Sequence, residues 1–247
     1  MSGRRIDGTV ALVTGANRGI GRALTEALLA RGARKVYATA RDLGGLEELR
    51  KRHPGRVMLL PLDVTRPEQV AGAARQAPDV AILINNAGVA AAQGLTGSAT
   101  VEQARREMAV NYFGPLLLLE RFADGLASRR GAVVNISSVA GLTNFPALPT
   151  YSASKAAVHS LTQGARALLA PRGVAVFGVY PGPVDTDMAR EITLEKTSPE
   201  AVAAAVLDGI EAGREDIFPD PFASAFGEQY QASPKESERQ LAAMVAA

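Results

Sequence analysis

Short, continuous apolar runs alternate with longer amphipathic stretches along the chain, and this rhythm limits the possible folds more than any other feature. The apolar runs predict strands at residues 9–14, 35–40, 56–62, 79–85, 131–136, 173–180 and 216–218. Apolar residues at helical spacing predict helices at 19–31, 43–51, 67–76, 100–128, 151–169, 199–212 and 233–246, with a bend at Gly114-Pro115. Strands without polar alternation are typical of strands that are buried on both faces.

The regular order of strand, helix and strand implies parallel pairing through right-handed crossovers. We therefore expect an α/β fold, a single doubly wound Rossmann-type domain over residues 1–247, with a parallel sheet of about seven strands. A length of 247 residues suits one large domain or two small ones, and no Ser/Gly-rich linker divides the chain.

The composition excludes several classes of protein. The chain has no cysteine and two histidines, so disulfides, thiolate ligands and cysteine nucleophiles are excluded, and we expect no metal site. A formal net charge of +2, from 27 basic and 25 acidic residues, gives no field that favours nucleic acid. No apolar run approaches the ~18 residues of a membrane span, and the first residues lack the apolar core of a signal peptide. We expect a cytoplasmic protein without a membrane or nucleic-acid partner.

A glycine-rich segment, Thr14 to Gly21, joins the first predicted strand to the first predicted helix. It has the form G-x-x-x-G-x-G, which differs in spacing from the common G-x-G-x-x-G dinucleotide motif. Glycines let the backbone approach a pyrophosphate, and the helix N-terminus offers N–H groups and a partial positive charge. The segment predicts a dinucleotide site, with a plain glycine-rich turn as the alternative. The residues assigned to the cofactor here are Gly15, Asn17, Arg18, Gly19, Ile20 and Gly21.

The end of the second predicted strand indicates which dinucleotide binds. An acidic residue at this place would hold a ribose 2′-hydroxyl and repel a 2′-phosphate. The strand instead ends in neutral residues followed by Arg41, and Arg18 of the glycine segment is expected to face the same ribose. Two guanidinium groups suit a phosphate dianion, so we expect NADP(H). Asp42 keeps NAD(H) open as the alternative, unless its carboxylate caps the next helix.

Five motifs follow one another in a fixed order: Thr14 to Gly21, Asn85-Asn86-Ala87-Gly88, Ser137-Ser138, Tyr151-Ser152-Ala153-Ser154-Lys155 and Pro181-Gly182-Pro183-Val184-Asp185-Thr186. As a set they are highly specific. The chain resembles the short-chain dehydrogenase/reductase family, and most of all its NADP(H)-preferring ketone and aldehyde reductases. The resemblance covers residues 7–190, and the remaining C-terminal part follows no motif.

The resemblance implies roles for residues that spacing alone does not assign. Asp63 and Val64 are similar to the pair that contacts the adenine, and Thr186 to the residue that bonds the nicotinamide carboxamide. Asn111 is similar to the asparagine that holds a water bridging to the active-site lysine, and it is counted with the catalytic residues. The other cofactor-binding positions implied by the resemblance are Asn86, Ala87, Gly88, Pro181, Gly182 and Val184.

Tyr151 and Lys155 are four residues apart and so share one face of a predicted helix. A phenol with a pKa near ~10 transfers protons poorly at neutral pH, and a neighbouring ammonium lowers that value. We expect Tyr151 to exchange the proton and Lys155 also to hold the nicotinamide ribose. Ser138, rather than Ser137, is expected to bind the substrate oxygen. His159 is expected to be a packed or interface histidine.

The predicted function is the reversible, NADPH-dependent reduction of a ketone or aldehyde to an alcohol. An NAD-dependent alcohol dehydrogenase and a non-catalytic dinucleotide-binding regulator are the alternatives. Mostly small or apolar side chains in the loops at 89–93 and 139–149 favour a small neutral carbonyl or alcohol substrate, and 183–198 is expected to form a short lid. Helices at 100–128 and 151–169 resemble the pair through which family members associate, so we expect a homo-oligomer, a dimer or tetramer. Residues 219–247 receive no role.

Overall fold

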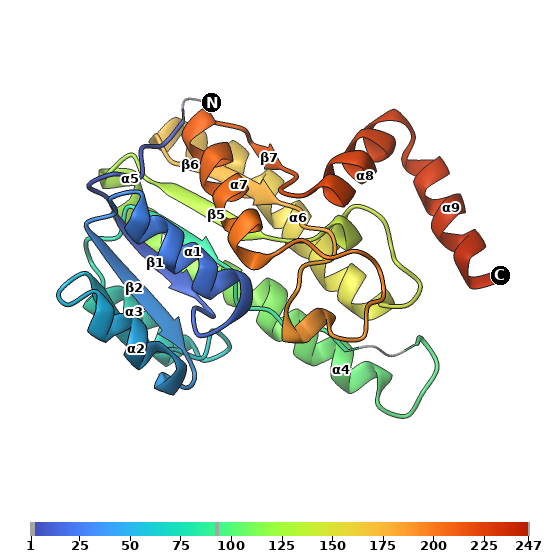
Figure 1. Cartoon of the computed structure of the whole chain (residues 1–247), viewed down its shortest axis with the longest axis horizontal. Coiled ribbons are helices and arrows are strands. Elements are labelled where there is room, and N and C mark those ends of the chain that lie inside the picture. The colour runs from blue at the N-terminus through green and yellow to red at the C-terminus, as the bar shows by residue number, and fades with distance from the viewer. Residues whose placement is uncertain (1–2, 92–93, 247) are drawn as a thin grey trace.

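Seven parallel strands form one sheet in the computed structural model, which describes residues 3–91 and 94–246 (Figure 1). The strand order is β3-β2-β1-β4-β5-β6-β7, so the direction of winding reverses between β1 and β4. The strands are β1 (Val10–Thr14), β2 (Lys35–Ala40), β3 (Val57–Pro61), β4 (Ile82–Asn85), β5 (Ala132–Ile136), β6 (Ala175–Val179) and β7 (Asp216–Ile217). The predicted doubly wound α/β fold is confirmed, and its ligand crevice is expected where the winding reverses.

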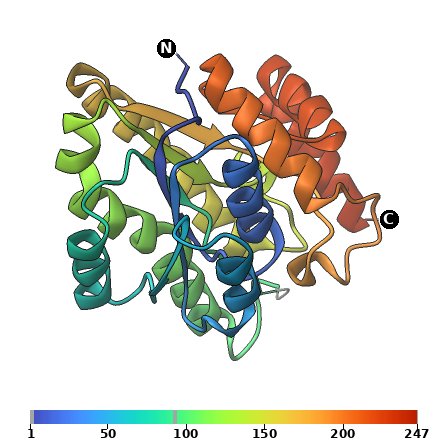
Figure 2. The same ribbon diagram turned by 60° about the vertical axis from the view of Figure 1, so that its left-hand side comes forward.

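Helices cover both faces of the sheet, as Figure 2 shows. One face carries α1 (Gly19–Ala30), α2 (Glu47–Arg52) and α7 (Pro199–Ala212), whose buried side chains form one apolar core with the strands. The other face carries α3 (Pro67–Gln76), α5 (Gly114–Ser128) and α6 (Pro149–Leu169) over a second core. Short 3₁₀ turns are η1 (Gly44–Leu46), η3 (Val139–Gly141), η4 (Ala170–Arg172) and η5 (Asp187–Ala189). None of the helices in the described ranges has the length and apolar character that crossing a membrane requires.

The long helix predicted at 100–128 is interrupted, but not where the sequence indicates. α4 (Thr100–Glu107) passes through a π-helical turn, η2 (Met108–Phe113), before α5 begins at Gly114. The distortion lies one turn before Gly114-Pro115, because proline is well tolerated in the first turn of α5. Gly114 is required for packing, since a Cβ there would lie 2.8 Å from Val64 Cγ2.

The prediction that every strand is buried on both faces is wrong for β3. This strand is at the edge of the sheet, and the Met58 side chain is 44% exposed. Met58 and Pro61 are exposed, whereas Val57 and Leu60 are buried, so the edge strand is covered only in part. The other strands of at least four residues are almost continuously buried.

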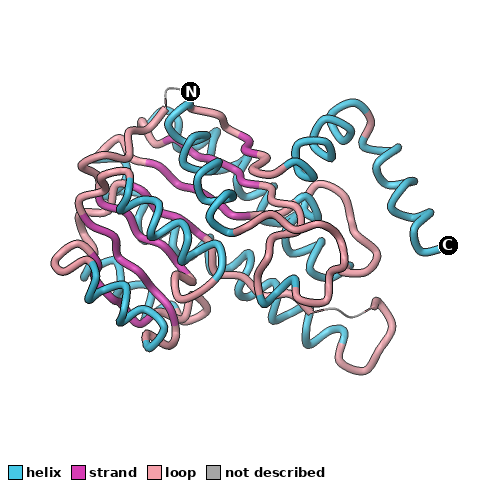
Figure 3. Tube along the Cα trace, in the orientation of Figure 1, coloured by secondary structure: helices cyan, strands magenta, loops and turns pink. Residues whose placement is uncertain are grey.

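A helix that the sequence did not indicate follows β7. α8 (Pro221–Ala232) packs through Phe222, Ala223 and Phe226 onto the loop after β5, and α9 (Pro234–Ala246) packs mainly on α8. Figure 3 shows both helices beyond the end of the sheet. The apolar stripe of α8 is short, so its periodicity is weak. The detectable signal is Asp220-Pro221, an N-cap residue followed by proline in the first turn.

Candidate active site

The glycine turn between β1 and α1 is tightly packed and leaves no room for side chains at its glycines. Gly15 has a φ of +65°, and a Cβ on it would lie 3.0 Å from the Ala87 Cα. A Cβ on Gly21 would lie 2.2 Å from the Gly15 carbonyl oxygen, so only glycine lets α1 start this close to the turn. The first N–H groups of α1 lack partners within the helix and carry the positive end of its dipole. These features fit a bound pyrophosphate.

The other residues predicted on this turn lie around it. Ile20 packs against the core beneath α1, and the Asn17 carbonyl oxygen faces Gly45. Gly19 has a φ of +52°, and a Cβ on it would lie 3.1 Å from Thr186 Cγ2. The turn after β1 is therefore next to the segment after β6, so one extended ligand can contact both.

The segment after β4 is fastened to the same turn. The Asn86 side chain donates to the carbonyl oxygens of Thr14 and Gly15 at 2.8 and 3.2 Å. The backbone N–H groups of Asn86 and Ala87 donate to Thr14 Oγ1 at 2.9 and 3.0 Å. These four bonds join the carboxyl ends of β1 and β4 where the winding reverses, which is where the sequence places the cofactor.

A buried chain of amides continues from β4 toward α6. The Asn85 side chain donates to Asn135 on β5 at 2.8 Å, and Asn135 donates to Thr162 on α6 at 2.9 Å. All three residues are at most 4% exposed. Because buried polar groups are costly unless they are bonded, this chain fixes α6 relative to the sheet.

The predicted adenosine-side residues lie after β2 and β3. Burial raises the pKa of Asp63, but hydrogen bonds from Thr65 and the positive charge of Arg41 outweigh burial and lower it. The Thr65 N–H and Oγ1 both donate to Asp63 Oδ1, at 3.0 and 2.7 Å. Arg41 is exposed at the end of β2 and close enough to Asp63 to act on its charge. Val64 is buried against the start of α5.

Arg18 and Asp42 are engaged in ways that the sequence did not specify. Arg18 Nη1 lies 2.8 Å from Asp187 Oδ2 in η5, and Arg190 also pairs with Asp187 at 3.0 Å. Arg18 thus has a carboxylate partner in this structure, and its expected place beside the ribose with Arg41 stays a prediction. Asp42 Oδ1 accepts from the Gly44 N–H at 2.9 Å, but the N-cap of η1 is Leu43, so the predicted capping role of Asp42 is wrong.

The segment after β6 joins the C-terminal helices to the crevice. The Gly182 N–H donates to Asp220 Oδ2 at 2.9 Å, while Asp220 Oδ1 caps α8 by accepting from the Ala223 N–H at 2.8 Å. A Cβ on Gly182 would lie 2.7 Å from the Phe222 ring. Val184 is buried, and its carbonyl oxygen accepts from Thr186 Oγ1 at 3.3 Å.

The two serines after β5 have different environments. Ser137 is buried, and its Oγ donates to the Lys155 carbonyl oxygen at 3.1 Å, so its hydroxyl holds α6. Ser138 Oγ is hydrogen-bonded to the Tyr151 side chain, accepts from the Ala140 N–H at 3.1 Å and lies 3.4 Å from the Pro181 carbonyl oxygen. Ser138 is therefore the serine whose hydroxyl meets the phenol.

Tyr151 lies in the first turn of α6, which begins at Pro149 and not at Tyr151 as predicted. The Lys155 Nζ lies 5.7 Å from the centroid of the Tyr151 ring and donates to the Ile136 carbonyl oxygen at 2.8 Å. Lys155 is 5% exposed. The two side chains share one helix face and converge at the end of β5.

Burial shifts the pKa values of both Tyr151 and Lys155. Burial raises it to about 12, the hydrogen bond from Ser138 opposes this, and the charge of Glu107 adds to it. Burial also lowers the pKa of Lys155 to about 8. In the protein alone, burial is the largest influence on the phenol and raises its pKa, so the expected lowering by Lys155 stays a prediction.

Asn111 lies in the π-helical turn and is 1% exposed. Its Oδ1 accepts from the Val89 N–H at 2.9 Å, and its Nδ2 donates to the Val89 carbonyl oxygen at 2.9 Å and to Ser154 Oγ at 2.8 Å. A Cβ on Gly88 would lie 3.4 Å from Asn111 Oδ1 and 3.6 Å from Lys155 Nζ. Asn111 thus lies beside Lys155, and its role through a water stays a prediction.

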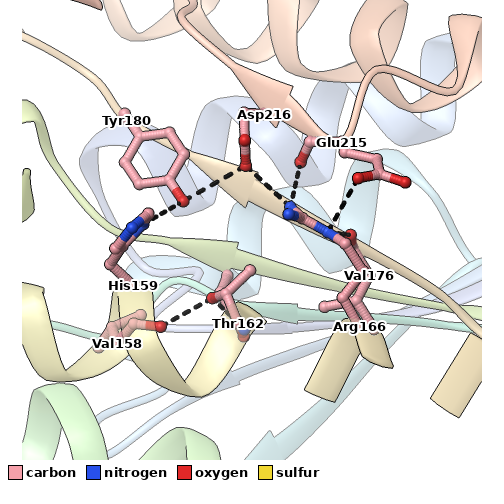
Figure 4. A network of polar contacts seen from close by, with 9 residues as sticks. Val158, His159, Thr162, Arg166, Val176, Tyr180, Glu215 and Asp216 are labelled. Carbon is pink, nitrogen blue, oxygen red and sulfur yellow. Dashed lines mark hydrogen bonds and ion pairs between the residues drawn. The ribbon is translucent and has the colours of Figure 1, made fainter. Parts of the chain in front are cut away.

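His159, on α6, belongs to a polar network with Tyr180, Asp216 and Arg166, shown in Figure 4. Its Nδ1 lies 2.7 Å from the Tyr180 hydroxyl, which lies 3.4 Å from Asp216 Oδ1. Arg166 donates to the same Asp216 oxygen at 2.8 Å. Burial lowers the pKa of His159 and raises that of Tyr180. The histidine is packed, as predicted, and the network ties α6 to β6 and β7.

Two further residues near the site were missed from the sequence. Glu107 is a buried carboxylate at the end of α4 whose charge reaches Tyr151, and Asp220 joins the segment after β6 to α8. Glu107 is four residues before Asn111, so helical spacing indicates that both lie on one face. Ala92 and Gln93, part of the predicted pocket loop, lie outside the described residues.

A doubly wound sheet whose crevice brings together a glycine turn, a serine, a tyrosine and a lysine defines an oxidoreductase that uses a nicotinamide dinucleotide. The sequence profile of the family described as short chain dehydrogenase matches residues 9–197. The chain belongs to the short-chain dehydrogenase/reductase family, whose enzymes act on alcohol and carbonyl groups.

Relatives agree with this assignment over nearly the whole chain. A short chain dehydrogenase from Burkholderia cenocepacia, solved in complex with NADP, is 41% identical with a TM-score of 0.91, covering 96% of this chain and 99% of its own. A short-chain dehydrogenase/reductase from Burkholderia phymatum, solved in complex with NAD, is 25% identical with a TM-score of 0.83, covering 95% and 97%. A 3-oxoacyl-[acyl-carrier-protein] reductase from Vibrio cholerae is 33% identical, covering 93% of this chain and 92% of its own.

Proposed function

We propose that the chain reduces a ketone or aldehyde to an alcohol with NADPH. One observation supports this most strongly: the Tyr151 phenol, a protonated group at neutral pH, is hydrogen-bonded to Ser138 and has the Lys155 Nζ 5.7 Å from its ring centroid. Reduction of a carbonyl needs such a donor beside the carbonyl oxygen. The carbonyl reaction named for the Vibrio relative also supports this direction.

The chain's own residues divide the work of the reaction. With NADPH bound, the nicotinamide would supply the hydride for the carbonyl carbon. Ser138 Oγ bonds the carbonyl oxygen and orients it, and the Tyr151 hydroxyl gives its proton to that oxygen. Lys155 holds the nicotinamide ribose, and its charge stabilises the phenolate that remains. The glycine turn binds the pyrophosphate, and Thr186 lies where the carboxamide is expected.

Selectivity for NADPH over NADH is proposed to rest on Arg41. It is exposed where the 2′-phosphate is expected, and the Burkholderia cenocepacia relative was solved with NADP, although the Burkholderia phymatum relative was solved with NAD. Arg18, which pairs with Asp187 through Nη1, is proposed to add a second positive charge. A charged hydrogen bond contributes about 1.5–3 kcal/mol, so one guanidinium gives a preference of about tenfold or more.

Fluorescence titration of Arg41→Ala with both cofactors tests this assignment. We expect NADPH to bind about tenfold more weakly and NADH unchanged. Arg50→Ala is the matched control, because Arg50 is an exposed arginine on the following helix and pairs with Glu47. Equal weakening of both cofactors, or no weakening of NADPH, contradicts the role of Arg41.

The reaction itself is tested with a panel of neutral ketones and aldehydes. Consumption of NADPH, followed by absorbance, is expected with at least one carbonyl compound and is expected to stop without it. A preference for NADH in the same panel would favour an NAD-dependent alcohol dehydrogenase. Cofactor binding without turnover of any carbonyl or alcohol would favour the regulator alternative.

We also propose that the chain forms a homo-oligomer, a dimer or tetramer, through α5 and α6. Leu168 on α6 and Phe113 beside α5 are 76% and 51% exposed, and a contact between copies along these helices would cover them. Light scattering is expected to give a multiple of the 25.8 kDa chain mass, and Leu168→Glu is expected to lower it. A monomeric wild type would contradict the proposal.

A further inference from the structure

The C-terminal helix α8 brings an aromatic side chain to the crevice, although it lies outside the segment that the family profile matches. Phe222 is the second residue of α8 and is partly buried. A Cβ on Gly182 would lie 2.7 Å from Phe222 Cδ1 and 3.2 Å from Phe222 Cβ, so this side chain packs directly on the backbone of Gly182. The mechanism above gives no role to this contact.

The contact lies one residue away from the proposed catalytic serine's partner. The Pro181 carbonyl oxygen is 3.4 Å from Ser138 Oγ, and Ser138 is hydrogen-bonded to the Tyr151 side chain. Pro181 and Gly182 are neighbours in the chain. A single short stretch of backbone therefore separates the Phe222 ring from the hydroxyl that is proposed to bind the substrate oxygen.

Asp220 holds α8 at this place. Its Oδ2 accepts from the Gly182 N–H at 2.9 Å, and its Oδ1 accepts from the Ala223 N–H at 2.8 Å. The residue is 4% exposed. Because both carboxylate oxygens are engaged by backbone N–H groups, the side chain that the start of α8 offers to the crevice is the apolar ring of Phe222.

A second segment, the loop after β5, adds to the same aromatic surface. The ring centroid of Phe145 lies 5.5 Å from that of Phe226 on α8, and Phe226 stacks on Phe222 at 6.3 Å and 9°. The Phe145 N–H donates to Ser152 Oγ at 3.1 Å, and Ser152 directly follows Tyr151 on α6. We call these three phenylalanines the aromatic wall. Phe226 is buried, whereas the two outer rings are only partly buried and keep accessible apolar surface.

We propose that the aromatic wall selects substrates whose carbonyl carbon carries an aryl or similarly bulky apolar group, with Phe222 as the specificity-determining residue. This rests on the proposed carbonyl reduction. A substrate whose oxygen is bonded to Ser138 lies next to Pro181 and Gly182, where its aryl group packs on Phe222. Aromatic pairs are stabilised beyond the burial of their area, and a methyl group in the same place removes less apolar surface from water.

Three leucine variants separate this contact from general packing. Phe222→Leu removes the ring and keeps an apolar side chain, and Phe145→Leu does the same from the loop after β5. Phe218→Leu is the matched control, because Phe218 is also partly buried in the same apolar cluster. It packs on Gly227 of α8, where a Cβ would lie 2.7 Å from its ring, and not on Gly182.

The first measurement is the ratio of kcat/KM for acetophenone to that for propanone, which has a methyl group in place of the phenyl group. The intrinsic reactivities of the two ketones are the same for every variant, so a changed ratio reports contacts of the phenyl group. We expect Phe222→Leu to lower the ratio by about threefold to tenfold, Phe145→Leu to lower it less, and Phe218→Leu to keep it. An unchanged ratio in Phe222→Leu, or an equal fall in Phe218→Leu, overturns the proposal.

The second measurement needs no turnover. Acetophenone and NADP⁺ cannot react with each other, because both are oxidised, so ligand-observed NMR can measure the Kd of acetophenone in their presence. This Kd is expected to rise about threefold to tenfold in Phe222→Leu and to stay constant in Phe218→Leu. If no carbonyl is turned over, the proposed function fails, while this Kd still decides the role of Phe222: equal values in Phe222→Leu and the wild type overturn it.

Discussion

The glycine turn after β1 and the first turns of α6 serve one crevice but are built in opposite ways. At the turn, contacts of 2.2 and 3.0 Å from imagined Cβ atoms to the backbone show that any side chain is excluded. On α6, Tyr151 and Lys155 are the proposed catalytic side chains, and burial raises the pKa of the first and lowers that of the second. In the proposed function, the turn binds the cofactor through backbone groups, whereas α6 acts through side chains whose charged forms burial disfavours.

The two regions should therefore be sensitive to different kinds of substitution. Adding atoms should damage the turn, because its geometry depends on empty space. Removing one polar atom or one charge should damage the chemistry of α6 while leaving its packing intact. The predictions below test this contrast in order of decreasing effect.

Tyr151→Phe removes only the hydroxyl and gives the largest effect. Loss of a general acid typically costs about 10²- to 10⁴-fold in rate, so kcat for carbonyl reduction should fall in that range. Cofactor affinity, measured by fluorescence, should change little, because the turn is untouched. Tyr112→Phe, in the π-helical turn, is the control with an unchanged rate. If Tyr151→Phe keeps the wild-type kcat, the proposed contrast between the glycine turn and α6 is wrong.

Lys155→Met tests the charge that burial disfavours. Because burial lowers the pKa of Lys155 from 10.5 to about 8, the unfolded chain binds more protons than the folded chain between these values. The free energy of unfolding of the wild type should therefore rise with pH over this interval, by roughly 3 kcal/mol in all.

Lys155→Met has no titrating group at this position, so its free energy of unfolding should not show the rise with pH that Lys155 causes. Urea unfolding of both proteins at pH 8 and pH 10 measures the difference. The range stops near 10 because the raised pKa of Tyr151 acts in the opposite sense above it: the folded phenol then retains its proton while the unfolded one loses it. A parallel pH dependence of the two proteins would show that Lys155 is better solvated than its burial indicates.

Gly21→Ala tests the empty space of the turn. The added Cβ meets the Gly15 carbonyl oxygen at 2.2 Å, and overpacking of this kind costs about 1–3 kcal/mol. Cofactor binding should weaken with stability, because the start of α1 must move. Gly94→Ala is the control, since no atom lies within 4 Å of a Cβ built there. Thermal unfolding and cofactor titration of both variants distinguish crowding from a general effect of alanine.

Asp220→Ala gives the smallest effect and lies between the two regions. Loss of an N-cap costs about 0.5–2 kcal/mol, and this residue also accepts from the Gly182 N–H. Stability should fall by about that amount. The KM for the carbonyl substrate should rise while cofactor affinity at the glycine turn is kept. An unchanged KM would show that the contact between α8 and Gly182 does not affect substrate binding.

Features set by local pattern were predictable from the sequence. Continuous apolar runs predicted all seven strands of the sheet, and glycine spacing predicted the turn. The placement of Ser138, Tyr151 and Lys155 followed from motif order and the helical repeat. These features depend on residues that are close together in the chain, so they can be predicted from the sequence alone.

Features set by distant contacts were not predictable. The pKa of Tyr151 depends on burial and on Glu107, which is 44 residues earlier in the chain. The partner of Arg18 is Asp187, and the anchor of Gly182 is Asp220. The π-helical turn reflects how α4 and α5 meet other elements rather than the residues Gly114-Pro115 themselves. Each depends on tertiary packing that no local pattern encodes.

Asp220 links the segment after β6 to a part of the chain that the family profile does not match. The family profile ends at residue 197, so α7, β7, α8 and α9 lie in the part of the chain that it does not match. One oxygen of Asp220 starts α8, and the other holds the backbone beside the crevice. A chain cut before residue 220 would therefore lose the hydrogen bond that holds the Gly182 N–H, so the backbone after β6 depends on a residue outside the matched segment.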